Sequence, residues 1–321
     1  MKSFQIELYS EKYFHKWENF IKNSRNGTIF HSRSFLSYHP KDKFRDFSLL
    51  FLKDGNIFSV LPGCLIEDNN HKIFASHQGS TYGGFIIPYR FGIRDCLRLV
   101  EDFIEFIKKK GIDYIWMRYP EYIFEKEPSQ EIKFAMNYFG FKIEYMELST
   151  CYDLSLYNEN IPIIRQARKS YEKGIYCVFN DGNFKEFYRN LYKNLNEKYH
   201  REPTHTLEEI LKLKKLLKDY LILISAYYNQ IFIGGLLIFI ANEKTAHIFY
   251  STTKKNFKKG IFPNDALIDI AIREFKRRGF RFLNYGISTE NNGKIINFNL
   301  IRFKEKFKGF GVYREIWGLI V

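Results

Sequence analysis

The chain has 321 residues, four cysteines and a formal net charge of +14 at pH 7. This length can bury the core of one large domain, or of two domains of roughly 160 residues, without disulfide bonds or a structural metal. The cysteines are scattered without a CxxC pair, which argues against a disulfide framework and a zinc site, and no apolar run reaches the ~18 residues of a transmembrane helix. We expect a cytoplasmic protein, associated at most with the inner face of a membrane.

The predicted elements of the first half alternate between strands and helices. Strands are expected at 4–9, 46–52, 56–66, 72–77, 81–87, 113–120 and 141–148, and helices at 11–23, 31–40, 93–110 and 129–139. Asp54-Gly55 is a hairpin signal, and Gly111 is placed to end the helix at 93–110.

The second half restarts this pattern. Helices are expected at 162–173, 184–198, 207–218 and 264–278, and strands at 220–227, 230–241, 245–252 and 281–286, followed by a polar loop at 288–293, a short helix and a last strand. Positive charge is concentrated after residue 251. It favours an anionic partner such as a nucleotide, a phosphate-bearing donor, tRNA or an acidic lipid surface, and part of it can reflect biased composition.

Short motifs recur in the same order in both halves. IFAS at 73–76 matches IFYS at 248–251, KKKGIDYIWM matches KRRGFRFLNY, and Lys133-Phe134 matches Arg302-Phe303. The shared order predicts two copies of one mixed α/β unit, with chance similarity as the alternative. We place the boundary after residue 155, giving domains at 1–155 and 156–321.

One lysine stands out on the short helix near the C-terminus. Leu300, Ile301 and Phe303 share an apolar arc with Phe307, and Lys304 falls inside that arc. A lysine there either extends its ammonium to water or is buried with a shifted pKa, which suits chemistry. The matching residue of the first copy is Ala135, so the lysine is a property of the second copy alone, which favours function.

Two segments of the second half hold further polar candidates. The lysines 254, 255, 258 and 259 lie with Gly260 ahead of a helix entered at Pro263 and Asn264, as in a phosphate site or in a plain solvated loop. His200 and His205 precede the capping box Thr206–Glu209. We expect no metal there; His205 is a candidate base or hydrogen-bonding group, or an ordinary loop residue.

The glycine-rich segment SHQGSTYGGF at 76–85 is the candidate of the first half. It fits neither GxGxxG nor the P-loop pattern, which excludes dinucleotide and ATP-hydrolysis sites of those types. His77, Gln78 and Tyr82, with Arg118, favour binding of a polar substrate, and a simple glycine turn is the alternative. The chain lacks GxSxG and HExxH, so direct nucleophilic catalysis is not expected.

The segments KNLNEKYHREPTHTLEEILKL, GGLLIFIANEKTAHIFYSTT and YGISTENNGKIINFNLIRFKEKFKGFG resemble FemAB-like acyltransferases of the GNAT superfamily, and most closely the BioF2-like branch found with bacterial surface-polysaccharide genes. The resemblance implies a mixed α/β fold of two tandem GNAT-like domains, the first supporting or acceptor-binding and the second catalytic. It also implies transfer of an acyl group from a thioester or ester donor to an amine or hydroxyl.

The resemblance and the candidates above together assign expected roles. Lys304 stabilises developing negative charge, and Glu290 or His205 takes the acceptor's proton. The expected acceptor-binding residues are His77, Gln78, Tyr82, Arg118, Ser288, Thr289 and Asn292; the expected donor-binding residues are Tyr250, Lys258, Lys259, Gly260 and Asn264.

The donor and the acceptor stay open at this point. GNAT enzymes hold the pyrophosphate of CoA in an R/Q-x-x-G-x-G/A loop, whereas this chain has KKGIFPND. Acyl-CoA is the first expected donor, with a nucleotide- or lipid-linked sugar of surface polysaccharide as acceptor. The alternatives are a Fem-type transferase that uses aminoacyl-tRNA on a peptidoglycan precursor, and a non-catalytic module that binds an anionic ligand. DNA is not an expected partner.

Overall fold

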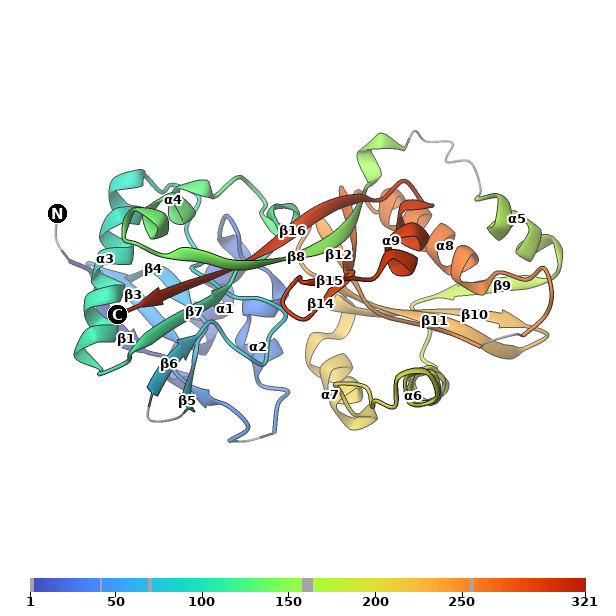
Figure 1. Cartoon of the computed structure of the whole chain (residues 1–321), viewed down its shortest axis with the longest axis horizontal. Coiled ribbons are helices and arrows are strands. Elements are labelled where there is room, and N and C mark those ends of the chain that lie inside the picture. Colours follow the sequence, from blue (N-terminus) through green and yellow to red (C-terminus); the bar gives the residue numbers. More distant parts are fainter. Residues whose placement is uncertain (1–2, 41, 69–70, 158–163, 255–256) are drawn as a thin grey trace. The chain divides into compact units, whose positions relative to one another are not determined.

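The computed structural model describes residues 3–40, 42–68, 71–157, 164–254 and 257–321 (Figure 1). The chain forms two compact units. The first holds Met1–Leu148, Thr289–Ile296 and Val312–Val321, and the second holds Ser149–Ser288 and Asn297–Gly311. This division differs from a single boundary after residue 155, because a hairpin and the C-terminal strand return to the first unit.

The first unit is a mixed α/β structure. Its strands are β1 (Gln5–Leu8), β2 (Arg45–Asp46), β3 (Leu49–Lys53), β4 (Asn56–Leu61), β5 (Cys64–Asp68), β6 (His71–Ala75), β7 (Tyr114–Arg118), most of β8 (Lys142–Asp153) and of β16 (Phe310–Ile320), and the short pair β14 (Thr289–Glu290) and β15 (Ile295–Ile296). Strands β1, β3 and β4 form one antiparallel sheet, and a second sheet has the order β2-β5-β6-β7-β16-β8. Only β6 and β7 pair in parallel within the described registers of this unit.

The helices of the first unit follow the predicted order. They are η1 (Glu11–Tyr13), α1 (Phe14–Asn23), η2 (Ile29–His31), α2 (Arg33–Leu36), α3 (Ile93–Lys109), η3 (Tyr122–Phe124) and α4 (Gln130–Tyr138). Helix α3 buries Leu99, Val100, Phe103 and Ile107 at helical spacing, which explains why it forms and covers the core.

Local turn chemistry was predicted correctly at two places in this unit. Asp54 and Gly55 both have positive φ in the turn between β3 and β4. Gly111 has φ +64° just after α3. The strand predicted at 81–87 is wrong, since only Ile86 forms an isolated bridge, to Val60, and the strand predicted at 56–66 is two strands, β4 and β5.

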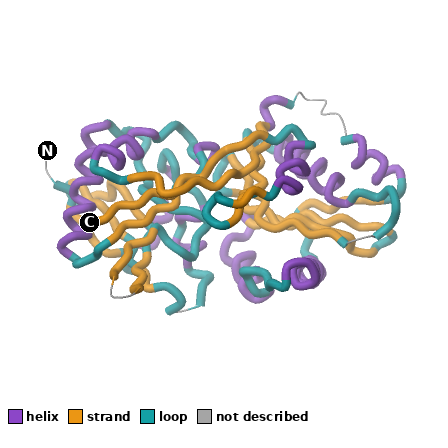
Figure 2. The backbone as a smooth tube through the Cα atoms, in the orientation of Figure 1, coloured by secondary structure: helices purple, strands orange, loops and turns teal. Residues whose placement is uncertain are grey.

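The second unit is built on one sheet with helices on both faces (Figures 1 and 2). Its strand order is β8-β13-β12-β11-β10-β9, with β9 (Ile175–Phe179), β10 (Leu221–Tyr228), β11 (Ile231–Ile240), β12 (Thr245–Thr253) and β13 (Phe282–Ile287). The helices are η4 (Leu154–Leu156), α5 (Arg165–Glu172), α6 (Phe184–Tyr199), α7 (Leu207–Leu217), η5 (Lys218–Tyr220), α8 (Pro263–Arg277) and α9 (Phe298–Glu305). Helices α6 and α7 lie on one face, and α8 lies on the other with α5 packed against it. Strand β9 was not predicted.

The predicted repeat has a structural counterpart in the order of elements. Apart from η3 in the first series and the β14–β15 pair in the second, the elements follow one another as α3-β7-α4-β8 and again as α8-β13-α9-β16. Gly111 and Gly279 both have positive φ directly after the first helix of each series. Ala135 and Lys304 are both buried on the second helix. The mixed α/β fold predicted from the sequence is therefore confirmed.

Candidate functional site

The candidate site of the second unit lies where two parallel strands separate. Strands β12 and β13 pair only from Thr245–Phe282 to His247–Asn284, although β12 continues to Thr253. The pairing of β13 with β8 also shifts register between Asn284 and Ile287. A parallel ladder that stops early leaves backbone groups beyond its last pair, and these need other partners.

Lys304 supplies a partner for this freed backbone. Its Nζ donates hydrogen bonds to the carbonyl oxygens of Gly286 (2.8 Å) and Ile287 (3.0 Å) and to Oγ of Ser288 (2.8 Å). The ammonium also lies 5.1 Å from the ring centroid of Tyr285. The residue is only 2% exposed, so the alternative that the lysine extends its charge to water is wrong.

Burial lowers the pKa of Lys304 to about 7. The three oxygen partners can form hydrogen bonds with Lys304 in its charged and in its neutral form. A charged ammonium donates to all three oxygens, whereas a neutral amine can donate to the two carbonyls and accept from the Ser288 hydroxyl. This lysine is therefore satisfied both with and without its extra proton near neutral pH.

Helix α9 fixes the position of the lysine. Asn297 caps the helix by accepting a hydrogen bond from the backbone N–H of Leu300 at 3.0 Å. Phe307 is buried just past the end of α9, and Phe303 packs against the Tyr285 ring. The apolar arc predicted from the sequence thus holds the Lys304 side chain against the end of β13.

A second polar pair joins two residues that the sequence singled out separately. His205 Nδ1 lies 3.0 Å from the hydroxyl of Tyr250, and His205 is 6% exposed. Tyr250 follows an irregularity at Phe249, which the register of β12 against β11 skips. The capping box Thr206–Glu209 at the start of α7 is confirmed, while His200 is exposed at the end of α6.

The predicted phosphate site at the start of α8 has little capacity left for an anion. Pro263 has no N–H, and the N–H of Phe262 already donates to Oγ of Ser170 at 2.8 Å. Buried Asp265 occupies the first turn and pairs with Lys306. A carboxylate at that point competes with any pyrophosphate for the positive end of the helix.

The remaining donor-side residues surround this helix start. Lys258 donates to the Tyr228 hydroxyl at 2.6 Å, and the carbonyl of Lys259 accepts from Lys173 at 3.5 Å. Gly260 has φ +75°, and Asn264 lies 3.5 Å from Oγ of Ser251. Lys255 lies outside the described residues.

The glycine-rich segment of the first unit is packed rather than open. Burial lowers the pKa of His77 to about 4, and its Nδ1 accepts a hydrogen bond from the N–H of Gly79 at 3.2 Å. The Tyr82 side chain is fully buried against Phe30. Such a tyrosine can reach a substrate only if its surroundings move.

The other predicted acceptor residues of the first unit differ in their exposure to solvent. Gln78 is exposed, and the Arg118 guanidinium lies 5.0 Å from the Trp116 ring centroid. In the β14–β15 hairpin Glu290 and Asn292 are exposed. Thr289 is buried, where its hydroxyl accepts from the N–H of Leu148 at 3.2 Å.

The structure therefore joins Lys304 to Ser288, and His205 to Tyr250, within the second unit. Glu290, Thr289 and Asn292 belong to the first unit with His77, Gln78, Tyr82 and Arg118. The carbonyls of Gly286 and Ile287 were missed, because a backbone acceptor carries no side-chain signal. The only sequence feature near these carbonyls is the dipeptide Gly286-Ile287 itself, directly before the polar loop.

One buried ion cluster of the first unit also escaped prediction. Arg314 is 6% exposed and lies 3.4 Å from Glu121, which is fully buried, and 3.6 Å from Glu147. No three metal-ligating side chains cluster within the described ranges, and no helix in those ranges combines the length and apolar character needed to cross a bilayer.

Comparison with known proteins finds a family model that matches part of the chain, mostly residues of the second unit. Residues 178–316 match the sequence model of the FemAB family. No curated protein matches the sequence.

The fold is shared with several solved structures. FemX matches with a TM-score of 0.73 and 11% identity over 99% of this chain and 97% of its own. The C-terminal domain of a putative lysylphosphatidylglycerol synthetase from Agrobacterium fabrum matches with a TM-score of 0.61 and 10% identity over 96% and 91%. A tandem GNAT protein from the clavulanic acid biosynthesis pathway matches with a TM-score of 0.55 and 8% identity over 99% and 98%. At these identities the likeness establishes the tandem GNAT fold.

Proposed function

We propose that the chain is a FemAB-like transferase, and that it moves an acyl or aminoacyl group from an activated ester or thioester to an amine or hydroxyl of a cell-envelope precursor. The observation that carries this proposal is Lys304, a buried lysine held by three oxygen atoms where β12 and β13 separate. A buried cation at the point where two strands stop pairing is suited to a reaction in which negative charge develops on a carbonyl oxygen.

Lys304 acts in this mechanism as an electrostatic group. When the acceptor attacks the donor carbonyl, the C–O double bond opens to an oxyanion, and the lysine ammonium stabilises that charge. Of the three oxygens that accept hydrogen bonds from Lys304, the Ser288 hydroxyl is the one that can most easily be replaced by the oxyanion. A hydroxyl can rotate away, whereas the carbonyls of Gly286 and Ile287 are fixed by the backbone. The acceptor's proton passes to a base, for which His205 and Glu290 are the candidates.

The start of α8 favours an aminoacyl-tRNA donor over acyl-CoA. A CoA pyrophosphate needs free backbone N–H groups at a helix start. Here Pro263 lacks one, Phe262 has committed its own to Ser170, and Asp265 adds negative charge. The excess of lysine and arginine after residue 251 suits a polyanion such as tRNA, whose binding is then salt-sensitive. Acyl-CoA remains the second candidate donor, and the FemAB match to residues 178–316 is compatible with either.

Two acceptors suit the proposed reaction. One is a nucleotide- or lipid-linked sugar used for surface polysaccharide, and the other is a peptidoglycan precursor. Both present amines or hydroxyls beside phosphate groups, which suits a chain with a net charge of +14. We place the reaction in the cytoplasm, at the inner face of the membrane where such precursors are made. In this proposal the second unit is catalytic, and the first supports it or binds the acceptor.

Mass spectrometry tests the donor and the reaction together. The purified chain is incubated with mixed acyl-CoAs or with charged tRNA, and with each acceptor class, and the acceptor is examined for the added mass. We expect transfer from charged tRNA that Lys304→Met abolishes and that Arg302→Met, a matched change at an exposed position of α9, leaves intact. Transfer from acyl-CoA alone would reverse the choice of donor, and full activity of Lys304→Met would remove the lysine from the mechanism.

A further inference from the structure

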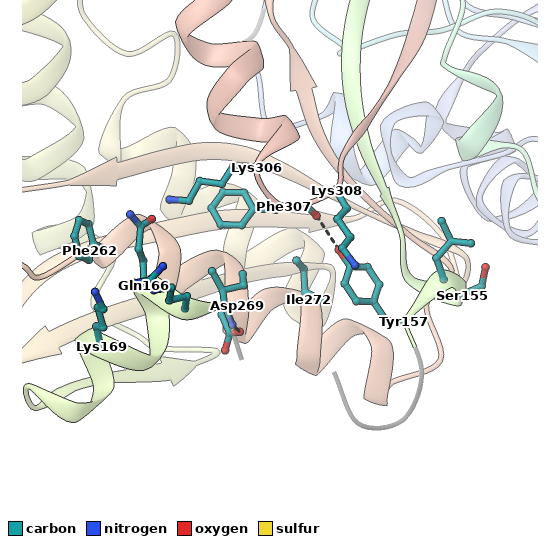
Figure 3. A pocket seen from close by; sticks show the side chains of 13 residues that line it. Ser155, Tyr157, Gln166, Lys169, Phe262, Asp269, Ile272, Lys306, Phe307 and Lys308 are labelled. Carbon is teal, nitrogen blue, oxygen red and sulfur yellow. Dashed lines mark hydrogen bonds between the residues drawn. The ribbon is translucent and has the colours of Figure 1, made fainter. Parts of the chain in front are cut away.

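The second unit contains a large cavity that the proposed transfer does not use. The cavity measures about 990 Å³ and lies between α5, α8, η4 with Tyr157, and the end of α9 (Figure 3). Small-molecule sites typically occupy ~300–1,000 Å³. Lys304 is not among the residues that line it.

The walls of this cavity are suited to an apolar chain. Leu156, Ile164, Phe262, Ile272 and Phe307 contribute apolar surface. Leu156 is 78% exposed, so its apolar surface is open to a ligand.

Two of the polar side chains along these walls, Tyr157 and Asp269, are already bonded. The Tyr157 hydroxyl donates to the carbonyl of Phe307 at 2.8 Å. Asp269 accepts from Ile164 N–H (3.0 Å), from the Tyr171 hydroxyl (3.2 Å) and from Nε of Arg273 (2.9 Å). A sugar or a base edge would therefore find few free partners on these walls.

The cavity also carries unbalanced positive charge. Arg165, Lys169 and Lys308 line it, and none of them forms an ion pair with a carboxylate of the described residues. Lys306 is neutralised by Asp265. The amide oxygen of Gln166 is buried and has no hydrogen-bond partner in the described part of the chain, so it can accept from a protonated oxygen of a ligand.

We propose that this cavity binds an anionic lipid, with its phosphate among Arg165, Lys169 and Lys308 and the start of its alkyl chain against the apolar walls. Phosphate on an alkyl chain is the ligand chemistry that matches both features at once. Binding there holds the second unit at an anionic membrane surface. The proposal does not depend on the chemistry at Lys304.

Calorimetry with soluble alkyl phosphates, below the concentration at which they aggregate, tests the site on the full chain. We expect one molecule of octyl phosphate to bind per chain, and affinity to rise by up to about fourfold per added methylene from butyl to octyl phosphate. Inorganic phosphate should bind at least tenfold more weakly than octyl phosphate, and octyl glucoside should show no binding. Equal affinity for inorganic and octyl phosphate, or tighter binding of ADP than of octyl phosphate, would overturn the proposal.

Charge-reversal variants separate the cavity from the general positive charge of the chain. Lys169→Glu with Lys308→Glu should weaken octyl phosphate binding at least tenfold. Lys212→Glu with Lys215→Glu makes the same charge change on exposed positions of α7, on the other face of the sheet, and should leave the affinity within twofold. Equal loss in both double variants would mean that only the net charge matters and would sink the idea.

Vesicle co-sedimentation separates a membrane lipid from a free alkyl phosphate. Vesicles of phosphatidylcholine with phosphatidylglycerol should retain the chain, and the Lys169/Lys308 variant should be retained markedly less than the Lys212/Lys215 variant. Equal retention of both variants, despite their difference in calorimetry, would reassign the site to a soluble alkyl phosphate and overturn the membrane role. The proposed transfer is read separately with soluble acceptors, so failure of one proposal leaves the other measurable.

Discussion

The difference in unfolding free energy between Lys304→Met and the wild type should favour the variant more at pH 7 than at higher pH. The lysine has an ordinary pKa of 10.5 when unfolded and about 7 when folded. Between these values the unfolded chain binds a proton that the folded chain does not, so the wild type gains stability as pH rises from 7 towards 10.5. The cost of burying the lysine is largest below pH 7 and vanishes above 10.5.

The size of this effect follows from the two pKa values. At 1.36 kcal/mol per pH unit the full cost is about 5 kcal/mol. At pH 7 the cost is a little over 4 kcal/mol, and at pH 9.5 it has fallen to about 1.4 kcal/mol. The difference in unfolding free energy between Lys304→Met and wild type should therefore shrink by about 3 kcal/mol between pH 7 and pH 9.5.

Urea unfolding of both proteins at these two pH values measures the effect. Loss of the hydrogen bonds to Gly286 and Ile287 also costs stability in the variant, but that cost is nearly independent of pH and cancels between the two conditions. Arg302→Met serves as the control, because its side chain is exposed. A difference that stays constant within about 0.5 kcal/mol would refute the claim that the Lys304 ammonium is desolvated in the folded state.

Three other predictions can be checked on the same material. Transfer should fall as pH rises through about 7, because the proposed mechanism needs the charged form of Lys304; a pH–rate profile that rises there would assign the lysine as a base instead. Gly286→Ala should lower the unfolding free energy by about 1–2 kcal/mol and reduce transfer at least tenfold. The position has φ +70°, and the nearest atom to an added Cβ is 3.6 Å away, so backbone strain and not crowding would displace the carbonyl that accepts from Lys304. Unchanged activity would contradict this. Glu121→Gln should lower the unfolding free energy by roughly 1–3 kcal/mol, because it removes one of the two carboxylates beside buried Arg314 and leaves Glu147 as its charged partner. Glu127→Gln at an exposed position should change it little.

Sequence patterns predicted most elements of both units because these elements depend on short-range periodicity. Helix α3 follows from its apolar spacing, the β3–β4 turn follows from Asp54-Gly55, and the α7 start follows from Thr206 and Glu209. Where the pattern was ambiguous the prediction failed, as at 81–87, where a glycine-rich segment is held by packing of Tyr82 and not by a strand ladder.

The candidate site likewise has features that could be predicted from the sequence and features that only the tertiary structure shows. Lys304 could be placed on the buried face of its helix because the other four residues of its arc are apolar, and its absence from the first copy marked it as special. Its three acceptors could not be foreseen, since they depend on where β12 and β13 stop pairing, which is a contact between distant segments. Likewise, a run of lysines suggested a phosphate site, but the partners that Ser170 and Lys306 give to the start of α8 are set by chain folding.

The sequence by itself thus determined the alternation of helices and strands, the repeated order and the inward position of Lys304, all of which depend on residues a few positions apart. Only the tertiary structure decided whether that lysine reaches water or is enclosed, and which residues return to the first unit. The physical reason is that burial and hydrogen bonding in this chain join segments far apart in sequence, and a pKa responds to those surroundings and not to sequence neighbours.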